Sequence, residues 1–173
     1  MLLFLDYDGV LHPDDVFLRS DGSVELRAPG DLFMWAPILV ELISDLKVHI
    51  VLSTSWVRHL GFKRARKALP NQLSSRVVGA TWHSAMKLSG TGHILWDEQS
   101  RYEQINSYLN RLASKQNWLA IDDDAVGWPD DKREHLVLTN PRLGLSDAGS
   151  GQELAQRLSE SSKIMLPGVR KVP

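Results

Sequence analysis

Residues 1–12 read MLLFLDYDGVLH, an apolar run of strand length that leads directly to two aspartates and a glycine. Side chains of an extended strand alternate between its faces, so Asp6 and Asp8 start on the same side and can converge just beyond the sheet. Gly9 lets the backbone turn tightly enough for main-chain groups to approach an ion or a small anion. The stretch predicts a buried amino-terminal strand that carries two carboxylates to a metal-assisted site. An ordinary turn after a buried strand is the alternative.

The length of 173 residues predicts one domain, residues 1–166, followed by a loosely ordered tail, residues 167–173. A chain of about this size buries roughly 70% of its unfolded surface, so one core is sufficient. The absence of cysteine excludes disulfides, thiolate catalysis and cysteine-ligated zinc. It also fits a reducing compartment, and we expect a cytoplasmic protein.

The chain contains no run near the ~18 apolar residues that a membrane span requires, so we expect no contact with a membrane. Its formal charge is −1, from 20 basic and 21 acidic side chains. This balance argues against a large nucleic-acid footprint and allows a local basic patch.

Short β-rich runs alternate with helical patterns, as is typical of βαβ units in a parallel sheet. The expected strands are residues 2–5, 48–52, 76–81, 118–121 and 135–138. The expected helices are residues 33–46, with Asp31 as a cap, then 58–69, 102–113 and 149–159. Most of the strand runs are almost continuously apolar, which indicates strands covered on both faces. The fold class is therefore α/β, a Rossmann-like parallel sheet with helices on both faces.

Residues 13–31, PDDVFLRSDGSVELRAPGD, interrupt this alternation directly after the first aspartates. VFLR and VELR flank the turn residues 20–23 and predict a β-hairpin. The hairpin is too small to be a folded cap domain over a pocket. It is either a flap that contacts substrate or an ordinary surface hairpin.

Two further strand ends carry polar clusters. HIVLSTSW places Ser53, Thr54 and Ser55 before a helix, where hydroxyls and free amides can cradle a phosphate or simply cap the helix. WLAIDDD ends in three consecutive aspartates, Asp122 to Asp124, whose mutual repulsion a cation would relieve. Mg²⁺ is the leading candidate because every ligand on offer is a hard oxygen, and a solvated acidic loop is the alternative. All these strand ends lie where open α/β sheets bind ligands.

The ordered set DYDGVLH, VLSTSW, a basic residue before a helix, and IDDD resembles the haloacid dehalogenase (HAD) superfamily of aspartyl phosphotransferases. More narrowly, LDYDGVLHP, LSTSW, RYEQINSYL, AIDDD and TNPRLGLS resemble the small HAD domains grouped with Swiss Army Knife RNA-repair systems. The resemblance implies a HAD fold and a Mg²⁺-dependent phosphatase that hydrolyses phosphate monoesters. Without a cap domain, a phosphorylated substrate as large as a nucleic-acid end can reach the site.

The resemblance also implies roles for individual residues. Asp6 would be the nucleophile that forms an aspartyl-phosphate, and Asp8 the general acid and base. Such a pair suits the chemistry, because one carboxylate attacks without deprotonation while the second moves the proton. The metal would be held by Asp6, by the main-chain carbonyl of Asp8, and by Asp122 or Asp123.

Phosphate binding is assigned to a hydroxyl and a base. The resemblance implies that Thr54 binds the phosphoryl group, with Ser53 as the alternative. Arg101 is the expected base because it opens the helix RYEQINSYL shortly before the strand that ends at Asp122, and Lys87 and Arg58 are its competitors.

Two other functions stay open beside the phosphatase. One is a noncatalytic HAD-like module that binds phosphorylated ends or a protein partner. The other is a phosphotransferase with an acceptor other than water. Neither the physiological substrate nor the oligomeric state follows from these residues.

Overall fold

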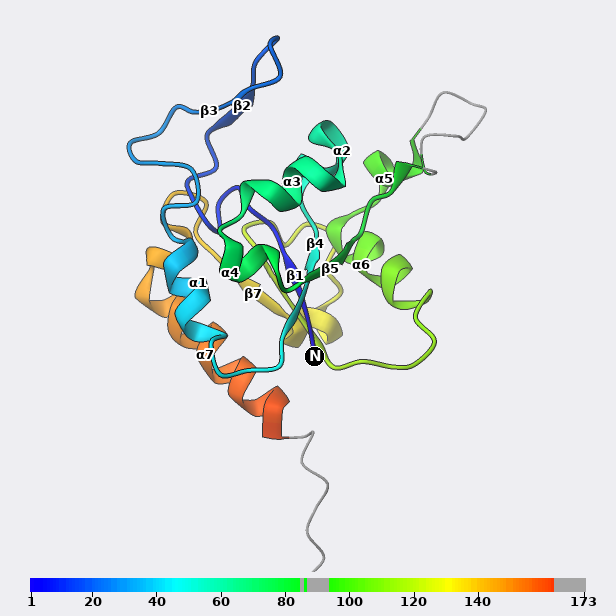
Figure 1. Ribbon diagram of the computed structural model, residues 1–173. Helices are drawn as coiled ribbons and strands as arrows, with labels where there is room; N and C mark the ends of the chain where they lie inside the picture. Colours follow the sequence, from blue (N-terminus) through cyan, green and yellow to red (C-terminus); the bar gives the residue numbers. More distant parts are fainter. Residues whose placement is uncertain (85, 87–93, 164–173) are drawn as a thin grey trace, which may run out of the picture.

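The computed structural model describes residues 1–84, 86 and 94–163, and its centre is a five-stranded parallel sheet in the order β5-β4-β1-β6-β7 (Figure 1). The strands are β1 (Leu2–Leu5), β4 (His49–Leu52), β5 (Val77–Ala80), β6 (Trp118–Asp122) and β7 (Leu136–Leu138). From β1 the chain builds outward through β4 and β5, and then through β6 and β7 on the other side. The carboxyl end of β1 therefore lies where the strand order reverses, the usual ligand crevice of such sheets. The predicted α/β parallel sheet is confirmed.

The strand register brings the three polar motifs to one edge of this sheet. Leu5 pairs with Leu52 of β4 and with Ile121 of β6. The Ser53 amide donates to the Leu5 carbonyl at 2.9 Å, and the Asp6 amide donates to the Ile121 carbonyl at 3.1 Å. The residues that follow each strand are consequently neighbours.

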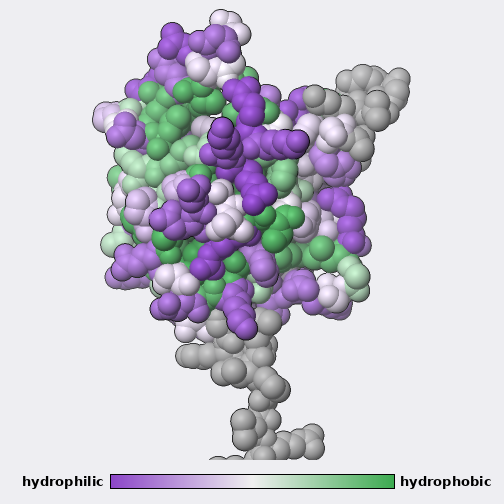
Figure 2. All heavy atoms as spheres, in the orientation of Figure 1, coloured by the Kyte–Doolittle hydropathy of each residue, from purple (hydrophilic) through white to green (hydrophobic). Residues whose placement is uncertain are grey.

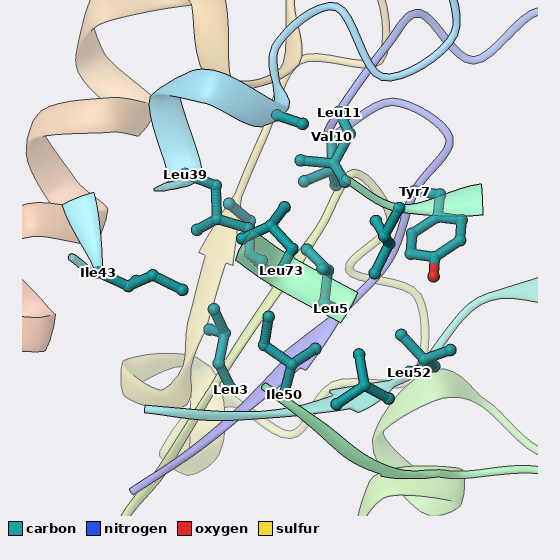
Figure 3. Close-up of a cluster of buried hydrophobic side chains, with 14 of the residues drawn as sticks. Leu3, Leu5, Tyr7, Val10, Leu11, Leu39, Ile43, Ile50, Leu52 and Leu73 are labelled. Atoms are coloured by element: carbon teal, nitrogen blue, oxygen red, sulfur yellow. The ribbon is translucent and has the colours of Figure 1, made fainter. Parts of the chain in front are cut away.

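The side chains of β1 alternate between two buried clusters. Leu3 and Leu5 pack in the larger cluster, with Leu39 and Ile43 at α1 (Ala36–Leu42) and with residues of α7 (Ala148–Lys163) (Figure 3). Phe4 packs in the second cluster with Ile105 of α6 (Arg101–Leu109). Helices therefore cover both faces, as expected. The alternation also sends Asp6 toward α6.

Two predicted helices differ from the structure because of backbone conformation. The expected helix 33–46 is shorter, since α1 begins only after Phe33, whose φ of 62° is left-handed, and the Asp31 side chain does not cap it. The expected helix 58–69 is divided into α2 (Ser55–Leu60) and α3 (Phe62–Ala68). The break falls at Gly61, whose φ of 82° cannot continue a helix. The short helices α4 (Asn71–Ser74) and α5 (Leu95–Glu98) complete this part of the chain.

The hairpin is formed by β2 (Val16–Leu18) and antiparallel β3 (Val24–Leu26), and it projects at the end of the sheet where β4 leads into α2 (Figure 1). Its turn is closed by Asp21, whose carboxylate accepts the amide of Ser23 at 2.8 Å. The tail expected at residues 167–173 lies outside the described residues. Within the described part of the chain, no helix is both long and apolar enough to cross a membrane.

Candidate active site

Asp6 is a buried carboxylate at the end of the central strand. Its Oδ1 accepts the amide of Tyr7 at 2.7 Å, and its Oδ2 accepts a hydrogen bond from Arg101 Nη2 at 2.9 Å. The Thr54 side chain lies near this carboxylate and lowers its pKa, against the effect of burial. The Tyr7 amide and the Arg101 guanidinium therefore fix the orientation of Asp6.

Arg101 bridges two strand ends. Its Nη2 lies 2.9 Å from Asp6 Oδ2, and its Nε lies 2.8 Å from Asp122 Oδ2. The side chain is aimed by the start of α6, where Ser100 and Glu103 form a reciprocal capping box. The local sequence SRYE thus places a guanidinium at the first helical position, beside the buried carboxylates.

Asp8 has a different set of partners. Trp56 Nε1 donates to Asp8 Oδ1 at 2.9 Å, and His12 Nε2 lies 3.0 Å from the same oxygen. His12 Nδ1 accepts the amide of Phe33 at 3.2 Å. A neutral imidazole carries one proton, so the ring holds it on Nε2 and donates it to Asp8. Two N–H groups therefore fix the Asp8 carboxylate beside Asp6.

Sequence reasoning missed these two donors to Asp8. His12 lies in the turn after the first motif, and Trp56 lies 48 residues beyond Asp8. A local pattern gave no sign that Trp56 would meet Asp8. Trp56 directly follows the hydroxyl cluster 53–55, at the edge of the sheet where Asp8 also lies. This position is the signal that could have indicated the contact.

An acidic cluster follows from the convergence of β1 and β6. Carboxylate oxygens of Asp6, Asp122 and Asp123 lie within 4.8 Å of one another. Both oxygens of Asp122 have partners, since Oδ2 meets Arg101 and Oδ1 accepts the amide of Asp124 at 3.1 Å. Asp123 is half-buried. It is the carboxylate of this cluster that the Arg101 guanidinium does not bind directly.

Gly9 makes room for Asp123. Its φ is 66°, and a Cβ at this position would lie 2.2 Å from Asp123 Oδ2. The Gly9 carbonyl is held by the Thr139 hydroxyl at 2.7 Å, which ties this turn to the segment after β7. A glycine is therefore required both by the backbone conformation and by the close approach of the carboxylate.

The cluster holds more negative charge than one guanidinium compensates. Burial raises the pKa of Asp6, although Arg101 opposes the shift. Burial and the charge of Asp6 raise the pKa of Asp122 well above its ordinary value. Burial, Asp6 and Asp14 raise the pKa of Asp123 to about 7. Hard oxygen ligands that share an excess of negative charge within a few ångströms fit a divalent cation such as Mg²⁺.

A family model described as the HAD domain in Swiss Army Knife RNA repair proteins matches residues 2–149. The chain belongs to this family. The match covers all three strand-end motifs and Arg101, so the narrower resemblance predicted from the motifs is confirmed. No curated protein and no solved structure shows significant similarity to this HAD domain. Family membership indicates HAD-type phosphatase-like chemistry, which generally uses Mg²⁺.

The candidate bases of this HAD domain occupy different places. Arg101 reaches Asp6, as the motif order predicts. Arg58 instead forms two hydrogen bonds of 3.1 Å to the carboxylate of Asp97, at α5. Lys87 lies outside the described residues. Of the candidate bases that the structure describes, Arg101 is thus the one that contacts Asp6.

The two candidate hydroxyls of the HAD domain are both buried, and only one meets Asp6. The Thr54 hydroxyl accepts the amide of Trp56 at 3.4 Å, which caps α2, and the Thr54 side chain also lowers the pKa of Asp6. Ser53 Oγ is buried without a hydrogen-bond partner among the described residues. Of the two hydroxyl residues, Thr54 is therefore the one that interacts with the Asp6 carboxylate.

Proposed function

We propose that this HAD domain hydrolyses phosphate monoesters through an aspartyl-phosphate on Asp6 and that its substrate is the phosphorylated end of a nucleic acid. The observation that carries the proposal is the Arg101 guanidinium hydrogen-bonded to the buried Asp6 carboxylate, with Asp8 and Asp123 beside it. A carboxylate, a proton carrier and a fixed positive charge are the parts that phosphoryl transfer to an aspartate requires.

In the first step, a carboxylate oxygen of Asp6 attacks phosphorus and the bond from phosphorus to the leaving oxygen breaks. Asp8, in its protonated form, gives its proton to that leaving oxygen. In the second step, Asp8 takes a proton from water as the water oxygen attacks phosphorus, and the bond from phosphorus to the Asp6 oxygen breaks. The products are inorganic phosphate and a regenerated Asp6.

Arg101 and Thr54 stabilise and orient the reacting groups. The Arg101 guanidinium offers several N–H donors in one plane, so it can bind phosphate oxygens while it remains near Asp6. Asp6, Asp123 and the main-chain carbonyl of Asp8 would hold Mg²⁺, which supplies positive charge to the phosphoryl group when bound.

The family description and the small size of the hairpin support a nucleic-acid end as substrate. The family occurs in RNA repair proteins. The insertion after the first motif is a two-stranded hairpin, not a folded cap, so a long strand can approach Asp8.

The test is release of inorganic phosphate from 5′- and 3′-phosphorylated oligonucleotides and from an aryl phosphate, with and without Mg²⁺. We expect Mg²⁺-dependent release that Asp6→Asn abolishes and that Asp124→Asn leaves unchanged. Asp124 belongs to the same acidic triplet, yet it is exposed, and among the described residues its carboxylate accepts only the amide of Val126. Binding of the oligonucleotides without any release would contradict hydrolysis and favour a binding module. Phosphate recovered on an added alcohol in place of water would indicate a phosphotransferase.

A further inference from the structure

A cavity of about 240 Å³ lies between the hairpin and α2, directly beside Asp8. Its lining residues are Asp8, Val16, Leu18, Val24, Ser55, Trp56, His59 and Leu60. Three of the apolar walls come from β2 and β3, and the others come from α2. Asp8 is the one lining residue that the proposed chemistry also uses as a proton carrier.

We propose that this cavity, the base pocket, holds the nucleobase of the nucleotide that carries the phosphate to be removed. The inference rests on the proposed function, because it takes Asp8 as the acid that protonates the leaving oxygen. The part of the substrate that is bonded to this leaving oxygen must therefore begin beside Asp8. The base pocket is the described cavity that opens at this position.

The lining selects for a flat, uncharged group. Among the described residues that line the pocket there is no lysine or arginine, so a second phosphate or a carboxylate would find no counter-ion. Apolar and aromatic walls favour a ring, and the Ser55 hydroxyl and the His59 imidazole can hydrogen-bond the heteroatoms at its edge. The volume is below the roughly 300 Å³ at which pockets for larger ligands begin. One base fits this space, and a base pair does not.

The surface beside the pocket favours a nucleic acid over a phosphopeptide. Helix α3 carries Lys63, Arg64, Arg66 and Lys67, all exposed, and contains no acidic residue. Arg64 Nη2 donates to the carbonyl of Gly22 at 2.9 Å, so this basic helix contacts the tip of the hairpin that covers the pocket. Figure 2 shows strongly hydrophilic side chains gathered over this part of the molecule. The phosphates of the following nucleotides would meet these cations.

Leu18 and Phe17 provide a matched pair of variants on one strand. Leu18 lines the pocket, whereas its neighbour Phe17 lies on the other face of β2, with the Arg27 guanidinium 3.9 Å from its ring centroid. Both side chains are substantially exposed, at 50% and 41%, so either can be replaced by asparagine without opening the core. Neither belongs to the proposed catalytic residues.

The experiment measures KM and kcat for a phosphorylated oligonucleotide and for the same strand with an abasic terminal nucleotide. We expect the wild-type protein to show a KM about tenfold higher for the abasic strand, the scale of losing one base contact. Leu18→Asn should raise KM by a similar factor for the normal strand and leave the abasic strand unchanged. Phe17→Asn should change neither. Equal effects of Leu18→Asn on both strands, or a lower KM for a phosphotyrosine peptide than for the oligonucleotide, would overturn the base pocket.

A binding measurement separates this inference from the proposed function. Fluorescence anisotropy with the same two labelled oligonucleotides gives their Kd values without turnover. The abasic strand is expected to bind with a higher Kd than the normal strand. If this difference is found while no substrate releases phosphate, it would refute the phosphatase and support the pocket. Release of phosphate with no contrast in KM or Kd would refute the pocket alone.

Discussion

Arg101 Nη2 lies 2.9 Å from Asp6 Oδ2, although the two residues are 95 positions apart in the chain. The contact joins the start of α6 to the end of β1, and the same guanidinium also holds Asp122 of β6. The Arg101 side chain therefore both connects α6 to the sheet and contacts Asp6, the candidate nucleophile. Its loss should affect both stability and activity.

We predict that Arg101→Met abolishes phosphate release and lowers the free energy of unfolding by about 3 kcal/mol at pH 8, because it leaves buried carboxylates without a partner. The loss should be smaller at pH 5, where these carboxyls can bind protons. Urea unfolding at the two pH values measures it. Arg58→Met is the control, since its pair with Asp97 is exposed and should contribute less than about 1 kcal/mol. Equal losses in the two variants would contradict a special role for Arg101.

The acidic cluster should make stability fall as pH rises. Burial and neighbouring carboxylates raise the pKa of Asp123 to about 7 in the folded chain, from an ordinary value of 3.8. Between these values the folded state binds more protons than the unfolded state, so the free energy of unfolding decreases as pH increases. Thermal unfolding from pH 5 to pH 8 without metal should show this decline.

Mg²⁺ should oppose that decline, because it binds the ionised carboxylates of the folded chain. We expect the rise in Tm on adding Mg²⁺ to be larger at pH 8 than at pH 5. Asp123→Asn should remove most of this rise, and Asp124→Asn should keep it. A rise in Tm that survives Asp123→Asn would show that the ion binds elsewhere.

Gly9→Ala should weaken Mg²⁺ binding more than backbone strain alone explains. An alanine would be strained at a φ of 66°, and its Cβ would lie 2.2 Å from Asp123 Oδ2. Gly61→Ala is the matched control, with a φ of 82° and no atom within 4 Å of the added Cβ. Each should lose about 1–3 kcal/mol of stability through backbone strain. Only Gly9→Ala should also raise the Mg²⁺ concentration needed for half-maximal phosphate release.

His12 should act as a positioning residue for Asp8. His12→Gln can retain a donor near the place of Nε2, whereas His12→Asn retains an acceptor for the Phe33 amide and loses the donor to Asp8. We expect kcat to fall about tenfold or more in His12→Asn and less in His12→Gln. This loss of kcat is a fraction of the rate enhancement that acid–base catalysis contributes. The KM should change little in both. A similar kcat in the two variants would indicate a structural role only.

The strands were predictable because a fully buried parallel strand has a nearly continuous apolar run, and all five expected runs became strands. Helix ends were less predictable, because the left-handed backbone of Phe33 and Gly61 depends on surrounding contacts. The motif order predicted which residues would meet at the sheet edge. It did not distinguish Asp122 from Asp123, because that difference arises from the distant Arg101 and from the space beside Gly9.

The most direct test of the account is whether Asp6 becomes phosphorylated. An oligonucleotide or aryl phosphate that the protein hydrolyses is mixed with it in the presence of Mg²⁺, the reaction is quenched in acid within one turnover, and the peptides are analysed by mass spectrometry. We predict the mass of one phosphoryl group on the peptide that contains Asp6, lost in Asp6→Asn and retained in Asp124→Asn. Phosphate release at full rate with no phosphorylated peptide, or with the phosphoryl group on another residue, would contradict the proposed mechanism.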